Sequence, residues 1–256
     1  MKRTAYLVFS AAFLSICAFL LAGCGIEDYP YLYPVSQGNI SQELNSRAIV
    51  YIDGANSGND SFYNFAVYYR IYVSNIIESS PLPGNFSAIN PVLAQDYSVI
   101  ASYINSTTVG NTSMGSLFQG RNYNTLELSN GSIDSILASV PTTMILEFPQ
   151  NPVNPAQPWP FLTVNGSGPY YLYRSTGNGR FNPMPLNNRY FMNYEELNRP
   201  EYINSNNNAD VVDKAGTPRY AYAAFFIVAV GFDANTFSMI YSTPAFVGVL
   251  RLPDPQ

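Results

Sequence analysis

Two long stretches of the chain have the hydrophobic pattern of β-strands. In residues 62–74, every second side chain from Phe65 to Val73 is apolar or aromatic, so these side chains share one face of a strand. Residues 220–232 are apolar on both faces, with Phe225 on the face opposite to the tyrosines that begin the run. Because neither face of this second strand is polar, it is predicted to be central and covered on both sides.

Shorter apolar runs predict further strands separated by turns. Residues 47–53 form such a run and end at the polar residues 54–60. Near the C-terminus, residues 237–241 and 246–252 are predicted to complete a closing hairpin that is kinked at Pro244. Since proline cannot donate to a β-ladder, the kinked strand is predicted to lie at an edge. Two more strands are predicted at residues 123–128 and 142–148.

Two segments carry apolar residues at helical spacing. Asn90 is a predicted N-cap with Pro91 at the first helical position, and apolar residues follow from Leu93 to Ile104 at steps of four, three and four. Residues 132–140 repeat this spacing and stop before a proline. The sequence therefore predicts a mainly β protein, an antiparallel β-sandwich with a mixed insertion that contains one or two short helices.

Residues 1–23 have the pattern of a secretory signal peptide. Lys2 and Arg3 give a positive start, residues 5–20 are almost wholly apolar, and small residues precede Cys24. The apolar run has about sixteen residues, fewer than the roughly twenty that a membrane-spanning helix needs. The length of the run and the small residues at its end disfavour a retained transmembrane helix.

The four residues Leu21, Ala22, Gly23 and Cys24 resemble the lipobox of bacterial lipoproteins, a branched apolar residue and two small residues before a cysteine. The resemblance implies diacylation of the Cys24 thiol, cleavage before this residue and acylation of the new amino group. Several acyl chains anchor a protein stably, because each buried CH₂ group contributes about 0.8 kcal/mol. In that family, an Asp after the cysteine favours retention at the inner membrane, so Gly25 in this position favours the outer membrane or cell surface.

Residues 24–44 are predicted to be the lipidated cysteine and a flexible tether. The prolines between Tyr29 and Pro34 favour extended backbone and disfavour a helix. The tyrosines of this stretch could alternatively pack on the folded domain, which is predicted to span residues 45–256.

Three short segments together resemble a fibronectin type III-like, or immunoglobulin-like, β-sandwich. Residues 65–70 are similar to a central strand of that family, and residues 228–231 are similar to the end of its penultimate strand. Residues 241–244 are similar to the opening of its last strand. The resemblance implies a single sandwich domain in which residues 78–218 form a large insertion.

Composition limits the partners that the exported part can have. Charged residues make up only 11% of the chain, so solubility depends on neutral Asn, Ser, Thr and Tyr. After removal of residues 1–23, ten basic residues remain against seventeen acids, a net charge of −7. This charge disfavours nucleic acid and anionic lipid surfaces as partners.

Cysteine and histidine usage excludes several chemistries. Cys17 lies in the signal peptide, Cys24 is predicted to carry lipid, and the sequence has no histidine. A Ser-His-Asp triad, Cys-His catalysis and the usual zinc sites are therefore excluded, and no cofactor is predicted.

Two groups of residues with side-chain oxygens are candidate sites for a calcium ion or for glycoside hydrolysis. The polar loop after residue 52 supplies oxygens, but Ala55 occupies a calcium-ligand position and Asn64 replaces the closing glutamate, which favours an ordinary loop. Acids adjacent in sequence rarely face one glycosidase cleft, so the paired carboxylates are predicted to be solvated. The calcium candidates are Asp53, Ser57, Asn59 and Asp60, and the paired acids are Glu195 with Glu196 and Asp210 with Asp213.

Prolines recur every third residue from Pro149 to Pro158, the period of a polyproline II helix. This stripe could be a ligand for an aromatic groove, but a stiff loop that carries Trp159 is favoured. The sequence as a whole predicts a non-enzymatic binding or adhesion-type lipoprotein of the bacterial envelope. It would be attached to the bilayer through acylated Cys24 and would bind a protein or glycan. A structural or assembly subunit and a carboxylate-dependent hydrolase are the alternatives.

Overall fold

The computed structural model describes residues 30–104, 113–128, 133–150, 160–174, 191, 210–212 and 220–253. Residues 31–256 form one compact unit, separate from residues 1–30. The predicted signal peptide and lipobox thus lie outside the described residues, and the fold below is that of the compact unit.

The first sheet has six antiparallel strands in the order β1-β2-β6-β7-β8-β5. A tight turn at Asn165 and Gly166 joins β7 to β8, and both residues have positive φ, as a two-residue hairpin turn requires. The strands are β1 (Ile40–Glu43), β2 (Arg47–Ile52), β5 (Glu127–Leu128), β6 (Thr142–Glu147), β7 (Phe161–Val164) and β8 (Ser167–Tyr173).

The second sheet is built around the long antiparallel pair β3 (Phe62–Ser74) and β10 (Tyr220–Asp233). Two strands, β11 (Ser238–Tyr241) and β12 (Ala245–Arg251), pair with the same edge of β10. The far edge of β3 pairs with β4 (Asn124–Thr125) and, in parallel, with β9 (Val211–Val212). The predicted mainly β fold of antiparallel sheets is therefore confirmed.

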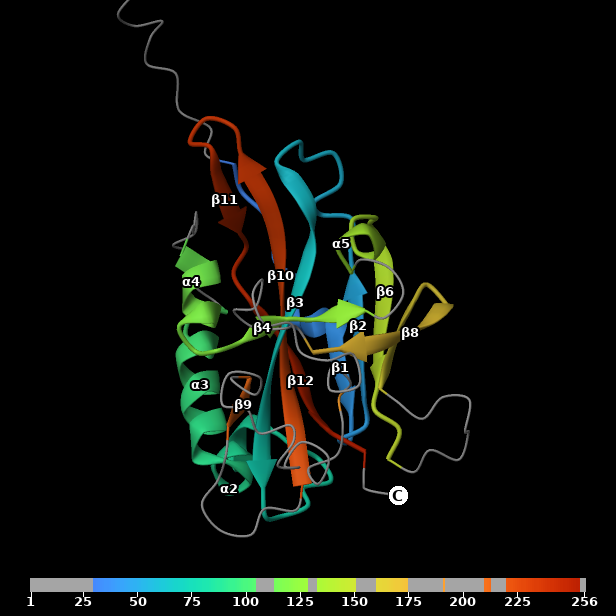
Figure 1. The fold of residues 1–256 in the computed structure, drawn as a ribbon. Helices are drawn as coiled ribbons and strands as arrows, with labels where there is room; N and C mark the ends of the chain where they lie inside the picture. The colour runs from blue at the N-terminus through green and yellow to red at the C-terminus, as the bar shows by residue number, and fades with distance from the viewer. Residues whose placement is uncertain are drawn as a thin grey trace, which may run out of the picture. The chain divides into compact units, whose positions relative to one another are not determined.

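Short helices cover one face of the second sheet, and the first sheet covers its other face (Figure 1). The helix predicted after Asn90 is confirmed, because the Asn90 side chain accepts a hydrogen bond from the Val92 N–H at 2.9 Å and Pro91 opens the helix. The helices on this face are α2 (Phe86–Ile89), α3 (Pro91–Ala101) and α4 (Ser113–Gln119). A further helix, α5 (Ile133–Ile136), packs in the core shared with the first sheet, and 3₁₀ turns lie at Gln37–Asn39 and Pro83–Asn85.

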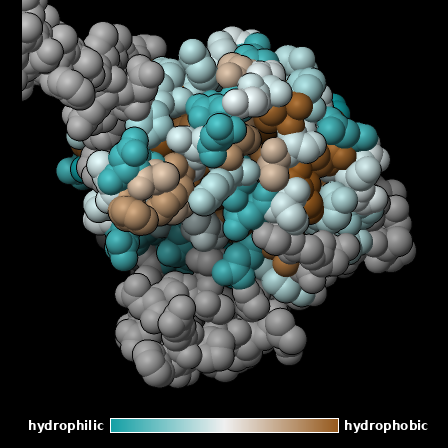
Figure 2. All heavy atoms as spheres, turned by 90° about the horizontal axis from the view of Figure 1, so that it is seen from above, coloured by the Kyte–Doolittle hydropathy of each residue, from teal (hydrophilic) through white to brown (hydrophobic). Residues whose placement is uncertain are grey.

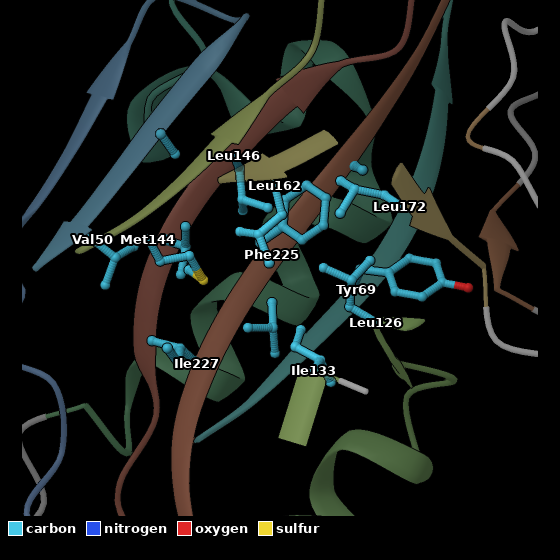
Figure 3. Close-up of a cluster of buried hydrophobic side chains, with 14 of the residues drawn as sticks. Val50, Tyr69, Leu126, Ile133, Met144, Leu146, Leu162, Leu172, Phe225 and Ile227 are labelled. Atoms are coloured by element: carbon cyan, nitrogen blue, oxygen red, sulfur yellow. The ribbon is translucent and has the colours of Figure 1, made fainter. Parts of the chain in front are cut away.

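Successive side chains of β3 and β10 point to opposite faces of the second sheet, and each face packs into a separate hydrophobic core. One face of the pair, with Tyr69, Phe225 and Ile227, packs against Val50 and Met144 of the first sheet (Figure 3). The other face packs under the helices, where its buried residues include Tyr72, Tyr222, Ala224, Phe226 and Val228. Burying a large apolar side chain contributes roughly 1.5–3 kcal/mol, so both faces of this strand pair stabilise the fold.

The compact unit begins at Tyr31, so the second half of the predicted tether is packed and not free. Leu32 and Val35 are buried in the core. The Asn56 amide accepts from the Tyr33 N–H and donates to the Tyr33 carbonyl oxygen, both at 2.9 Å. The backbone is thus held while the rings of Tyr31 and Tyr33 stay exposed.

The edge of β12 is closed by side-chain amides. The Gln42 amide donates to the Val249 carbonyl and accepts from the Val249 N–H, both at 3.0 Å. Gln37 makes the same pair of bonds with Phe246. Among the described strands β12 pairs only with β10, as expected for an edge strand, and amides occupy the groups that a further strand would use.

Residues 78–218, predicted to be an insertion, contribute strands to the first sheet. Residues 142–147 alternate between buried and partly buried positions and pair with β2. The hairpin of β7 and β8 extends this sheet further. The same stretch also supplies α2, α3 and α4, which cover the second sheet.

Candidate functional site

Most of the residues singled out in the sequence lie outside the described part of the chain. This holds for the lipobox residues Leu21, Ala22, Gly23 and Cys24, for Glu195, Glu196 and Asp213, and for Pro152, Pro155 and Pro158 of the proline stripe. The predicted acylation therefore stays a prediction.

The loop weighed as a calcium site is a polar loop that organises backbone. Asp53 Oδ1 accepts from the Ala55 N–H at 3.0 Å, and Asn59 Oδ1 accepts from the Ser61 N–H at the same distance. The Asn59 amide also donates to the Tyr31 carbonyl at 2.8 Å. These side-chain oxygens and amides therefore form Asx turns and hold the backbone at Tyr31, where the compact unit begins.

Asp210 was predicted to be solvated, and this is wrong. Its carboxylate is buried and forms a two-pronged ion pair with Arg174, with Nε to Oδ2 at 2.9 Å and Nη2 to Oδ1 at 2.5 Å. The Tyr69 hydroxyl donates to Oδ2 at 2.9 Å. Burial alone would lower the pKa of Arg174, but the Asp210 charge and the hydrogen bonds to Asp210 and Tyr69 outweigh it and raise this pKa. The pair joins the residue before β9 to the core, and both of its side chains are only 2% exposed.

A second buried carboxylate, Asp96 on α3, is shared by two arginines. Arg70 of β3 donates from Nη1 to Oδ2 at 2.6 Å, and Arg121, just after α4, donates from Nη1 to Oδ1 at 2.7 Å. The Asp96 side chain is 4% exposed, whereas those of Arg70 and Arg121 are 12% and 25% exposed. Two positive charges thus meet one negative charge, and both guanidinium groups reach the surface.

One buried tyrosine hydroxyl bonds the Asp96 carboxylate directly, and a second bonds the first. Tyr72 donates to Asp96 Oδ2 at 2.7 Å, and the hydroxyls of Tyr72 and Tyr123 lie 2.9 Å apart in a hydrogen bond. Burial, with the neighbouring Tyr123 and Asp96, raises the pKa of Tyr72 well above its usual value. Burial also raises the pKa of Tyr123. Both hydroxyls therefore stay neutral at ordinary pH and hold Asp96 in place.

An open hollow of about 380 Å³ lies over the two arginines. In each guanidinium only Nη1 has a hydrogen-bond partner among the described residues, and Arg70 Nε has none. Among the residues that the structure describes, no acid other than Asp96 lines the hollow, so this lining is positively charged in a protein whose overall charge is negative. The lining residues are Arg70, Asp96, Ser116, Leu117, Gly120, Arg121 and Asn122.

This arrangement is suited to binding an anion. Guanidinium groups donate several N–H bonds in one plane and match the geometry of carboxylates and phosphates. The hollow is within the size range of small-molecule sites.

Sequence reasoning missed this site, although two signals existed. Asp96 lies between Leu93 and Ile100 on the buried stripe of its helix, where an acid needs a partner. Arg70 lies on the polar-aromatic face of its strand, beside Tyr72. Nothing in the sequence around Arg121 connects it to either residue.

A second hollow of about 520 Å³ lies between α3 and the edge of β12. Tyr97, Phe246 and the Pro81–Pro83 turn give it a largely apolar lining, and Gln37 and Gln42 line it with their amides. These amides already bond to backbone groups of β12, so the hollow offers no free strand edge at those residues.

Comparison with protein-family models, with curated proteins and with solved structures finds no match for this chain. None of the described helices is long and apolar enough to cross a membrane. Within the described ranges, no group of three or more His, Cys, Asp and Glu side chains is placed to hold a metal ion. The function must therefore be argued from the chain itself.

Proposed function

We propose that this protein is a lipid-anchored lipoprotein of the bacterial envelope whose compact unit is a non-enzymatic binding module. The anchor is supported by the basic start, the short apolar run and the Leu21-Ala22-Gly23-Cys24 sequence. The outer membrane or cell surface is the proposed address. The binding role is supported by one observation, the uncompensated guanidinium charge at the open hollow.

The ligand of the hollow is proposed to be an oxyanion, foremost a carboxylate carried by a glycan or protein partner. Arg121 is the more exposed guanidinium, so it would contact the ligand most directly. A charge-assisted hydrogen bond contributes about 1.5–3 kcal/mol, which corresponds to an affinity change of about 10- to 100-fold. A neutral sugar or amide would gain no such contribution.

The binding proposal is tested by calorimetric titration of the purified protein with glucuronate, inorganic phosphate and neutral glucose. We expect an anion to bind, glucose to bind more weakly, and Arg121→Gln to lower the anion affinity about 10- to 100-fold. Arg47→Gln is the matched control, because Arg47 is a surface arginine paired with Glu43 and Glu147 on the other sheet. Equal losses in the two variants, or no anion binding at all, would contradict the proposal.

The anchor proposal is tested by Cys24→Ser. This variant lacks the thiol that receives the diacylglyceryl group, so it should leave the membrane fraction and carry no acyl chain by mass spectrometry. A variant that is uncleaved and still membrane-bound would show that residues 1–23 act as a retained span.

The finer fold assignment, a fibronectin type III-like sandwich, also remains our proposal. Its support is the strand order, since β3, β10 and β12 lie side by side as the C, F and G strands of such sandwiches do. In the other sheet β1 and β2 precede β6, as the A, B and E strands do. The hairpin of β7 and β8 and the helices over the second sheet would be additions to that plan.

A further inference from the structure

Exposed aromatic rings gather at the end of the molecule where the compact unit begins. Figure 1 shows the β10–β11 turn and the loop before β3 at this same end of the sheets. Figure 2 looks onto this end, where apolar, brown surface lies among hydrophilic, teal residues. The exposed rings are those of Tyr31, Tyr33, Tyr63 and Phe237.

Direct contacts join these segments. The Phe232 N–H donates to the Ser61 carbonyl oxygen at 2.8 Å, and a Cβ at Gly231 would collide with the same oxygen. Tyr63 stacks on Phe232, with ring centroids 6.3 Å apart and planes 4° from parallel. Phe237 lies edge-on to Phe232, with its ring centroid 6.4 Å from that of Phe232. Asn59 links the loop to Tyr31.

Phe237 is exposed to solvent and has a strained backbone conformation. It is 82% exposed and has a φ of 51°, a left-handed conformation that a bulky residue adopts only under constraint, at about 1–3 kcal/mol. Asp233 fixes the turn, because its carboxylate accepts from the Asn235 N–H at 2.9 Å and from the Thr236 hydroxyl at 2.6 Å. The turn thus presents an apolar ring that water does not favour.

The acidic residues near these rings indicate which type of lipid surface the rings could contact. The loop over residues 53–61 and the turn over residues 233–238 contain three aspartates and no lysine or arginine. Anionic lipid would be repelled, whereas a zwitterionic interface carries no net charge. Tyrosine and exposed apolar rings are the side chains that settle at membrane–water interfaces.

We propose that this aromatic end docks onto the zwitterionic lipid interface of the membrane that carries the anchor. The proposal rests on the proposed acylation of Cys24. The chain from Cys24 to Tyr31 spans at most about 25 Å even when fully extended, so the anchor keeps this end close to the headgroups. Phe237 and Tyr63 then enter the interfacial zone, and the rest of the compact unit extends away from it.

The experiment uses the full lipidated protein in phosphatidylcholine vesicles and a single introduced thiol. Removal of the signal and acylation of Cys24 leave no free thiol, so a spin label reports only the chosen site. Phe237→Cys and Tyr63→Cys probe the aromatic end. Leu82→Cys is the matched control, because Leu82 is an exposed apolar residue beyond the opposite end of β3.

We expect the ratio of oxygen to nickel-chelate collisions to be several-fold higher at positions 237 and 63 than at position 82, because oxygen concentrates in lipid and the chelate does not. Equal ratios at the three positions would overturn the proposal. Loss of access to both reagents at position 237 would also overturn it, since that result means a protein cover. Labelling of the unmutated protein would instead disprove the acylation of Cys24. This control therefore distinguishes failure of the proposed anchor from failure of the proposed docking.

Discussion

Strand β3 carries two tyrosines that hold two buried carboxylates, one on each face of the second sheet. On the face toward the first sheet, Tyr69 donates to Asp210, which a single arginine neutralises in a sealed, two-pronged pair. On the face toward the helices, Tyr72 donates to Asp96, which two partly exposed arginines share beneath an open hollow. The two clusters use the same residue types and differ in charge balance and access.

The difference in charge balance and access is the reason that we propose a binding role for the Asp96 cluster and a structural role for the Asp210 pair. The buried pair has one charge of each sign, and it joins the residue before β9 to the residue after β8. The open cluster has one guanidinium more than its carboxylate neutralises, and its remaining N–H donors are those that we propose an anion would use. The largest effect on stability is therefore expected at Asp210, and the largest effect on binding at Arg121.

Asp210→Asn should give the largest loss of stability. Removing this charge breaks the ion pair of the buried Arg174 guanidinium, which costs about 3–5 kcal/mol. Urea denaturation monitored by circular dichroism would measure the free energy of unfolding. The control Asp134→Asn changes an exposed acid and should stay within about 0.5 kcal/mol of the original protein. A loss at position 210 no larger than this would show that the Arg174 pair contributes little.

Asp96→Asn should give a smaller loss, about 1–3 kcal/mol, because both arginines reach water and the amide still accepts hydrogen bonds. The same change removes the only negative charge among the described residues that line the hollow, so anion affinity should rise while stability falls. Calorimetric titration with glucuronate beside urea denaturation would separate the two effects. If both stability and affinity fell, Asp96 would be part of the ligand's own binding geometry.

The smallest expected effect concerns alkaline pH. The pKa values of Tyr72 and Tyr123 are raised by burial in the folded protein, whereas in the unfolded chain both lie near about 10. Their contribution to stability is therefore complete below about pH 10 and is lost as the pH rises toward the folded-state pKa. Urea denaturation between about pH 8 and about pH 11 should show that Tyr123→Phe loses less stability than the original protein. Parallel profiles would assign alkaline unfolding to other tyrosines.

The sequence predicted the elements whose pattern is local. The alternation from Phe65 to Val73 fixes which face of β3 meets the first sheet, and the N-cap at Asn90 is readable without knowledge of the fold. The hairpin of β7 and β8 was not predicted, although Asn165 and Gly166 between two short apolar runs are a hairpin signal. β1 is too short and too polar to be recognised in the sequence, and its place depends on pairing with β2.

The candidate site could not be predicted, because it depends on which distant residues the fold brings together. Arg70, Asp96 and Arg121 lie on a strand, a helix and the residues after another helix. Only the packing of α3 and α4 on the second sheet joins them, and no local pattern encodes that packing. Asp210 shows the converse, since an acid that looks solvated among polar neighbours is drawn into the core by Arg174.

Uncharged side-chain amides close the edge of β12 and hold the backbone at Tyr33, so these contacts depend little on the pH and the salt concentration of the solution. Gln37, Gln42 and Asn56 carry no proton to gain or lose at ordinary pH and attract no counterions. Their bonds are therefore unaffected by changes of acidity and ionic strength that weaken exposed ion pairs. Outside the cytoplasm the medium is set by the surroundings and not by the cell. At the outer membrane or cell surface, where we propose that this protein lies, such uncharged contacts between β1 and β12 would keep the two sheets together.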